Sequence, residues 1–436
     1  MAIKLLGDNP VTGKIIVIGI IVLTLLIPLS MLRGLIRERM QMRDQAYATV
    51  AQGWGGKLTA GGPMLRIPFE IASKNKDGEL AVAKKQLYVL PSELTFDVKI
   101  TEEPEPRHVG IYRVPVYQAR IKLRGRFDGA RVKEAAKQAG VFQWPQAKLR
   151  LPLSDVRSVR ELTLATFAEK SLEFAPAEAG VYSAIEAPVD LTATLDQPGA
   201  EFSIDIKLAG SEALALLPLA AVTRANVSSA WPHPQFTGAF LPADRAISNE
   251  GFTASWQVLE LNRAFRQAWI DEQVGDAQLL SSAFGVELFQ SIDVYQRSER
   301  AVKYALMFIA LTFLSFYAWE LLTATPLHPM QYLFVGLALS TFYLLLIALS
   351  EHIAFAAAYW LGAGALASLL AVYLAGALRD RRSGGAIASV MIAVYGVLYL
   401  LVLSENYALL MGAITLFAVL ALVMLATRHV RWYAQP

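Results

Sequence analysis

Long apolar runs with few charges fill the last third of the chain. Residues 304–378 contain no Lys or Arg, and the carboxylates among them are Glu320 and Glu351. Residues 383–427 contain one charged side chain, that of Glu405. A helix of about 20 residues crosses the ~30 Å hydrocarbon core of a bilayer, so these runs are long enough to span a membrane. The pattern therefore predicts an integral membrane protein.

Another apolar run lies near the N-terminus, at residues 15–32, and it follows Lys4 and Lys14. It is long for the apolar region of a cleaved signal peptide, and arginines follow it without a cleavage site of the small-x-small type. We therefore expect an uncleaved signal anchor over residues 1–32 and a bundle of five further spans over residues 301–427. The six predicted spans are 15–32, 302–319, 331–349, 353–377, 386–404 and 407–426.

The short loops set the predicted orientation, because Lys and Arg are enriched in cytoplasmic loops. Arginines cluster at residues 379–382 and again at residues 428–431, within the C-terminal tail 428–436. Both clusters are predicted to be cytoplasmic, which places both chain termini in the cytoplasm and residues 33–301 on the outer side. The arginines that follow the first span disagree with this rule. Long domains, however, cross the membrane largely regardless of their flanking charges.

The segment on the outer side has two parts. Residues 33–60 carry apolar positions at helical spacing and predict an amphipathic stalk. Within residues 61–300, apolar and polar residues alternate in many short stretches, which predicts a periplasmic, mainly-β, sandwich-like domain. Strands are expected at 64–71, 80–90, 112–127, 189–195 and 201–208, and short helices near 130–138 and 261–270.

Composition and motifs exclude several classes of function. A net charge of only +3 with scattered Lys and Arg argues against a nucleic-acid partner. The chain has no Cys, and its five dispersed histidines show no metal-ligand spacing. Gly53–Lys57 looks like a phosphate-binding loop, but Leu58 stands where a Ser or Thr is required. Ser73–Lys76 matches Ser-x-x-Lys without its partner motifs. We therefore expect no enzyme, no cofactor and no metal.

Polar residues at the ends of the predicted spans are the candidate functional residues. Glu351-His352 and Glu405-Asn406 each follow a Leu-Ser pair, at the ends of the third and fifth spans. In one interpretation they cap the helices that follow. In the other, both glutamates and His352 face a polar pocket in the outer leaflet, where a histidine beside a carboxylate can relay protons.

Two more candidates flank the predicted inner loop between the second and third spans. These are Glu320 and His328. Prolines on either side of His328 fix a turn, and we expect this histidine to have a packing or interfacial role.

Segments spread over nearly the whole chain match one family pattern. They are Gly62-Pro63, Leu90-Pro91, Gly251–Trp256, His328–Tyr332, Leu349–His352 and Ser404–Leu410. With these segments the chain resembles the CreD family of bacterial inner-membrane proteins, which are described as cell-envelope integrity proteins. The resemblance implies an inner-membrane location and a link to envelope stress and to tolerance of bacteriocins and cell-wall antibiotics. It implies no reaction and therefore no catalytic residues.

Two functions stay open at this point. The first is a non-enzymatic inner-membrane protein that lies in the lipid bilayer and whose periplasmic β domain binds envelope components or a partner protein. The second is a transporter or lipid-handling protein with Glu351, His352 and Glu405 in a polar path. Whether these three side chains converge on one cavity distinguishes the two.

Overall fold

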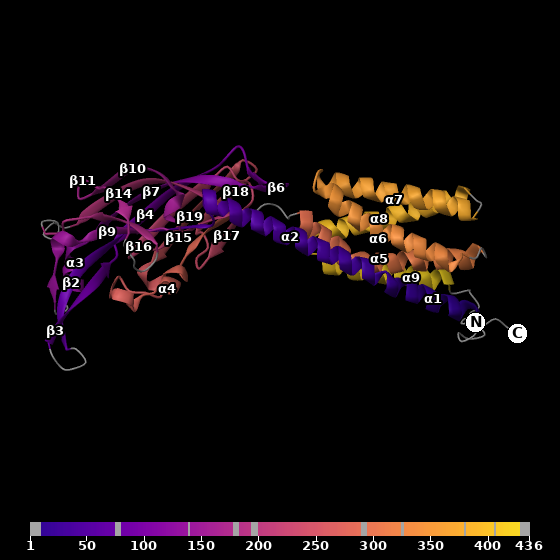
Figure 1. Cartoon of the computed structure of the whole chain (residues 1–436), viewed down its shortest axis with the longest axis horizontal. Coiled ribbons are helices and arrows are strands. Elements are labelled where there is room, and N and C mark those ends of the chain that lie inside the picture. Colours follow the sequence, from indigo (N-terminus) through magenta and orange to yellow (C-terminus); the bar gives the residue numbers. More distant parts are fainter. Residues whose placement is uncertain are drawn as a thin grey trace. The chain divides into compact units, whose positions relative to one another are not determined.

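The structure is a computed structural model that describes residues 10–74, 80–137, 140–177, 183–192, 199–288, 294–323, 327–378, 381–404 and 407–427. The chain divides into two compact units. A helical unit consists of residues 1–43 and 292–436, and a β unit consists of residues 44–291. Figure 1 shows the helices of the first unit and the sheets of the second.

The helical unit contains the apolar runs. Its helices are α1 (Pro10–Thr24), the first part of α2 (Leu26–Trp54), α5 (Val294–Thr323), α6 (Pro329–Ser350), α7 (Phe355–Leu378), α8 (Arg381–Leu403) and α9 (Ala408–Thr427). Among the described residues, four helical segments are long and apolar enough to cross a membrane: 13–54, 294–317, 329–350 and 355–376. The N-terminal apolar helix and three further apolar helices are thus present as predicted, whereas the fifth and sixth spans, in α8 and α9, stay a prediction.

Helix α6 illustrates how the sequence builds this unit. It begins with a capping box, in which His328 accepts a hydrogen bond from the Met330 N–H and Gln331 accepts one from the His328 N–H. Pro329 occupies the first turn, where its missing N–H costs nothing. The buried residues then recur every three or four positions and face neighbouring helices, as in Tyr332, Val335, Gly336, Leu339, Tyr343 and Leu346.

The described residues of the β unit form two large sheets and two small ones. The eight-stranded sheet has the order β11 (Lys170–Ser171), β10 (Val159–Phe167), β14 (Ala200–Ser211), β7 (Val116–Phe127), β4 (Glu93–Glu102), β16 (Val222–Ser229), β19 (Gly251–Leu259), β18 (Asp244–Ser248). The seven-stranded sheet has β12 (Ala175–Pro176), β13 (Ala184–Pro188), β9 (Lys148–Pro152), β2 (Met64–Lys74), β3 (Leu80–Val89) and β20 (Ala268–Ile270), with β8 (Val141–Phe142) paired to β2. The prediction of a large mainly-β domain is confirmed.

The smaller sheets complete the unit. One has the order β1 (Leu58–Gly61), β15 (Ala213–Leu217), β21 (Phe284–Leu288), β17 (Pro234–Gly238), and the other pairs β5 (Arg107–Val109) with β6 (Tyr112–Val114). Most neighbouring strands are antiparallel, but β1 pairs with β15 and β4 with β16 in parallel.

One hydrophobic core holds the large sheets together. Strand β4 contributes Leu94, Phe96 and Val98 to it, and strand β2 of the other large sheet contributes Leu65 and Ile67. Each of these side chains is at most 3% exposed, and burying such a side chain stabilises the fold by about 1.5–3 kcal/mol. Along β4 the buried positions alternate with less buried ones, so the opposite face of this strand is directed away from the core.

Three local predictions need correction. Residues 261–270 were expected to be helical, but they contain a 3-10 turn (Glu260–Asn262) and strand β20, and the nearby helix α4 lies at Asp276–Leu280. The reason is tertiary, since the apolar side chain of Trp269 stacks on Tyr88 of β3. The strand expected at 112–127 is interrupted at Pro115, which has no N–H to donate to a ladder.

The third correction concerns residues 189–195, where a strand was expected. Strand β13 ends at Pro188, residues 189–192 are not in a strand, and residues 193–195 lie outside the described residues. The helix expected near 130–138 is present as α3 (Gly129–Ala135), and the Asp128 carboxylate caps it by accepting from the Ala130 N–H.

Candidate functional site

Among the described residues, the glutamates flagged in the helical unit occupy two separate clusters. In the first, Glu320 of α5 accepts hydrogen bonds from the Lys14 ammonium of α1 and, over 3.1 Å, from the Tyr332 hydroxyl of α6. Lys14 Nζ also donates to the Leu327 carbonyl oxygen at 2.7 Å. The Lys14 and Glu320 side chains are only 18% and 11% exposed. This cluster therefore joins three helices through one largely buried ion pair.

His328 lies close to this cluster in sequence, but its side chain caps the N-terminus of α6. Its Nδ1 accepts a hydrogen bond from the Met330 N–H at 3.2 Å, and His328 is the N-cap residue of α6. The histidine is exposed, and the expectation that it has a packing or interfacial role stays a prediction.

The second cluster surrounds Glu351, which is the C-cap residue of α6. Its Oε1 accepts from the Tyr295 hydroxyl of α5 at 3.1 Å and lies 3.5 Å from Arg39 Nε of α2. The Glu351 side chain is 12% exposed. Its recorded partners are thus on other helices, whereas the capping interpretation placed it on the N–H groups of the next helix. His352 is exposed beside it.

Glu405 and Asn406 lie outside the described residues. Their convergence with Glu351 and His352 on one pocket therefore stays a prediction. Glu320 and Glu351 belong to different clusters, at opposite ends of α6. From Tyr332 to Glu351 this helix rises about 29 Å, which is close to the ~30 Å thickness of a hydrocarbon core.

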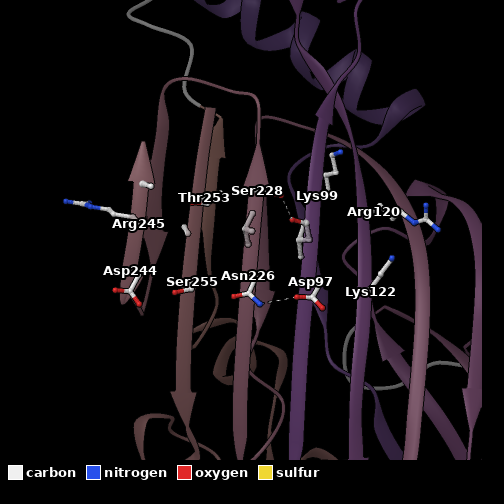
Figure 2. A pocket seen from close by; sticks show the side chains of 14 residues that line it. Asp97, Lys99, Arg120, Lys122, Asn226, Ser228, Asp244, Arg245, Thr253 and Ser255 are labelled. Atoms are coloured by element: carbon white, nitrogen blue, oxygen red, sulfur yellow. Dashed lines mark hydrogen bonds between the residues drawn. The ribbon is translucent and has the colours of Figure 1, made fainter. Parts of the chain in front are cut away.

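A polar hollow lies on the outward face of the eight-stranded sheet (Figure 2). Its volume is ≈ 660 Å³, and strands β4, β7, β16, β19 and β18 line it. Asn226 Nδ2 donates to the Asp97 carboxylate at 3.0 Å, and Ser228 Oγ donates to the Val98 carbonyl oxygen at 3.4 Å. These bonds hold polar side chains in place on a packed sheet. Figure 2 shows Arg120 and Lys122 of β7 to one side of this pair, and Lys99 further along β4, the strand that carries Asp97.

Arg120 is the most firmly oriented cation of the hollow. Its Nε and Nη2 atoms each donate to the Asp205 carboxylate of β14 at 2.9 Å, which is a bidentate arrangement. The hydrogen bond and the charge of Asp205 raise the pKa of Arg120 above its ordinary value. The guanidinium is therefore charged at every physiological pH.

Sequence reasoning missed several of these residues. It treated Lys and Arg as scattered, although Arg120, Lys122, Arg124 and Arg126 occupy alternate positions of one predicted strand. This period-two pattern was the available signal. The partners Lys14 and Arg39 could not be found in this way, because Lys14 and Glu320 are 306 positions apart.

Across the described ranges, no group of three or more His, Asp or Glu side chains is arranged to hold a metal ion.

The apolar helices and the large β unit define the class of this protein: an integral membrane protein with a substantial domain outside the spanning helices. The sequence model described as Inner membrane protein CreD matches residues 10–433, and the chain belongs to the CreD family. It is 30% identical to Inner membrane protein CreD of Escherichia coli (strain K12) over 426 residues, which cover 95% of this chain and 92% of that protein. The resemblance seen in the sequence is confirmed, and the chain is an inner membrane protein.

Solved structures add little. A substrate-bound mutant of an M1 zinc metallopeptidase from Deinococcus radiodurans aligns with 39% of this chain and 39% of its own, at 10% identity and a TM-score of 0.21. Another structure of that peptidase aligns with 39% of this chain and 38% of its own, at 8% identity and a TM-score of 0.17. Such low TM-scores support no argument about fold or activity.

Proposed function

We propose that this protein is a non-enzymatic inner-membrane protein that contributes to cell-envelope integrity. In this proposal the β unit lies in the periplasm and binds an envelope component or a partner protein, and five C-terminal spans together with the N-terminal helix anchor it. Membership of the CreD family supports the envelope role.

The polar hollow of the β unit is the observation that carries the proposal. Six charged side chains line it, namely Asp97, Lys99, Arg120, Lys122, Asp244 and Arg245. Four of them, Asp97, Lys99, Arg120 and Lys122, stand on β4 and β7, whose opposite faces are packed in the core, so the sheet presents these four in a fixed arrangement. Asp244 and Arg245 stand on the exposed edge strand β18. Binding sites are usually concave, and convergent polar groups in them fix the orientation of the ligand.

The ion pairs of the helical unit support an anchoring role better than a transport role. A carboxylate in a proton or substrate path needs access to its cargo, whereas Glu320 and Glu351 are each held by a cation and a tyrosine hydroxyl. The alternative, a transporter or lipid-handling protein that uses Glu351, His352 and Glu405, therefore has weaker support.

The test fills the hollow without changing its charge. Asn226→Trp places a large side chain on β16 at the centre of the hollow, and Thr163→Trp places the same side chain on an exposed position of β10 that does not line it. Each variant is expressed in a strain that lacks the protein, and its membrane level is measured by blotting. The readout is tolerance of detergents and cell-wall antibiotics.

We expect Thr163→Trp to restore tolerance and Asn226→Trp to fail at an equal membrane level. Restoration by both variants would contradict the proposal that the hollow is the working surface. Glu351→Gln and His352→Ala are tested in the same strain. Failure of these two variants, with full restoration by Asn226→Trp, would favour the polar path instead.

A further inference from the structure

Three cations stand side by side on the outward face of the eight-stranded sheet. In the ladder registers, Lys99 of β4 and Lys207 of β14 are both directly opposite Arg120 of β7. Directly opposed side chains on one face have Cβ atoms about 4.5–5.5 Å apart, and like charges at such positions are destabilising. Asp205 compensates one of the three charges, through its bidentate contact with Arg120, and Glu161 of β10 is directly opposite Lys207 on its other side.

Further basic side chains lie along β7 on the same face. Arg120, Lys122, Arg124 and Arg126 follow one another at every second position, so the row extends over about 20 Å at a rise of about 3.4 Å per residue. Arg124 has uncharged neighbours on both sides, Thr95 and Ser203.

The charge balance of this face is uneven. On the four central strands β14, β7, β4 and β16, the basic residues with outward side chains are Lys99, Arg120, Lys122, Arg124, Arg126, Lys207 and Arg224. The acidic ones are Glu93, Asp97, Glu201 and Asp205. The excess is three positive charges, equal to the net charge of the whole chain, on part of one sheet. Among the described residues, Lys99, Arg124, Lys207 and Arg224 have no recorded ion pair within 4.0 Å.

We propose that this face, which includes one side of the polar hollow, binds an extended polymer that carries phosphate groups. The inference rests on the proposed function, because it names the kind of envelope component that the β unit binds. Lysine and arginine side chains are the standard protein ligands of phosphate groups, and arginine contacts them with two parallel hydrogen bonds. The cation row of Lys99, Arg120 and Lys207 takes one phosphate group, and Arg124 with Arg224 takes another further along the chain of the polymer.

The length of the face favours a polymer over a single small anion. The two sets of cations are four positions apart along β7, which corresponds to about 14 Å. One phosphate group cannot contact both sets, whereas a chain with repeating phosphates can lie along the strand.

The chemistry of the face also disfavours a protein partner. The outward positions from Glu93 to Thr101 of β4, from Gln118 to Arg126 of β7 and from Glu201 to Lys207 of β14 are all polar or charged, whereas Val116 and Ala209, further along β7 and β14, are apolar and buried. Protein interfaces usually have a central apolar region with aromatic anchors, and no such region lies among these polar outward positions.

The experiment measures binding of linear polyphosphate to the full chain in nanodiscs of uncharged lipid. Lys99→Ala/Lys207→Ala removes two cations of the row, and Lys84→Ala/Lys137→Ala removes two exposed lysines elsewhere on the β unit. Both double variants lose the same net charge. Thermal unfolding of each variant checks its fold, and both double variants are expected to keep the unfolding temperature of the natural chain, because none of the four lysine side chains is buried.

We expect the Lys99/Lys207 variant to bind polyphosphate at least about tenfold more weakly, and the Lys84/Lys137 variant less than about twofold more weakly. Lys99→Arg/Lys207→Arg should retain binding. Inorganic phosphate alone should bind much more weakly than the polymer, and added salt should weaken the interaction.

Several results would overturn the inference. Equal losses in the two double variants would mean that net charge alone attracts the probe. Binding to vesicles that contain an anionic lipid, lost in the Lys99/Lys207 variant while polyphosphate is not bound, would identify a lipid surface instead. If polyphosphate does not bind but Asn226→Trp still abolishes tolerance in cells, the ligand class is wrong and the proposed function stands. If neither effect is seen, both fail.

Discussion

Buried charge in the β unit centres on the carboxylate of Glu186, which is 4% exposed. It accepts from Arg150 Nη1 at 2.6 Å and from Arg66 Nη1 at 3.2 Å, and Lys148 Nζ lies 3.4 Å away. Arg150 is itself 1% exposed. Removing one member of a buried ion pair leaves the other charge without compensation, which usually costs more than the pair contributed.

We therefore expect Glu186→Gln to lower the free energy of unfolding by about 3–5 kcal/mol. Glu93→Gln is the matched control, because Glu93 forms its ion pair with Arg126 on the surface, where both side chains are about half exposed. Its expected cost is about 0–1 kcal/mol. Denaturant unfolding of the full chain in mild detergent measures both values, and equal values would contradict the structural role assigned to Glu186.

At the scale of the element, the N-terminal helix is tied to the other helices by an ion pair at each end of the helical unit. Lys14 of α1 contacts Glu320 of α5, and Arg39 of α2 lies beside Glu351 at the end of α6. Between these contacts the helix packs through apolar side chains, including Leu25 and Leu29, which are at most 2% exposed. Pairing in a poorly hydrated environment fixes which helices are neighbours.

Reversing the charges of Lys14 and Glu320 tests whether their ion pair holds the helices together. Lys14→Glu places two carboxylates together and should lower stability by about 3–5 kcal/mol. The double variant Lys14→Glu/Glu320→Lys restores an ion pair of opposite polarity and should recover most of the loss. The stability of the variants is compared by the midpoint of thermal unfolding in detergent, and size-exclusion chromatography measures the fraction that stays folded at each temperature. A double variant no more stable than Lys14→Glu alone would show that the pair does not hold the two helices together.

The sequence predicts elements much better than it predicts their partners. Apolar length and the absence of charge are local properties, so the helices at 329–350 and 355–378 could be read directly from the chain. Glu320 and Glu351 could be flagged for the same reason, since a carboxylate beside an apolar run is costly without a partner. The identity of the partner depends on contacts between residues hundreds of positions apart, and no local pattern contains that information.

Strand β7 shows a related limit of prediction from the sequence. Its alternation of buried and exposed positions was predicted, but its basic side chains become one surface only when β4 and β14 pair on either side of it. Lys99 and Lys207 are 21 and 87 positions away from Arg120, and their alignment follows from the ladder registers. A charged surface of this kind is therefore a property of the sheet, and the sequence of one strand predicts only part of it.

At the scale of the whole molecule, the orientation of the chain in the membrane decides what the β unit can meet. The arginines of residues 379–382, which follow α7 and include the first two residues of α8, predict that this segment is cytoplasmic. Arg39 belongs to the arginines after the first span that disagree with this rule, and it lies beside Glu351. A cation that forms an ion pair carries less weight as an orientation signal, because its charge is partly neutralised. The proposal that the β unit is periplasmic follows from the remaining charges.

Single cysteines give a direct test of this orientation, because the natural chain has no cysteine and needs no prior removal. Leu261→Cys lies in the β unit at a side chain that is 92% exposed, and Gly385→Cys lies near the start of α8 at an exposed position. A thiol reagent that cannot cross the inner membrane should label Leu261→Cys in cells whose outer membrane alone has been opened. It should label Gly385→Cys only after the inner membrane is also opened. The opposite pattern would place the β unit in the cytoplasm, and the periplasmic binding role proposed for its basic face would then fail, because no periplasmic polymer could reach that face.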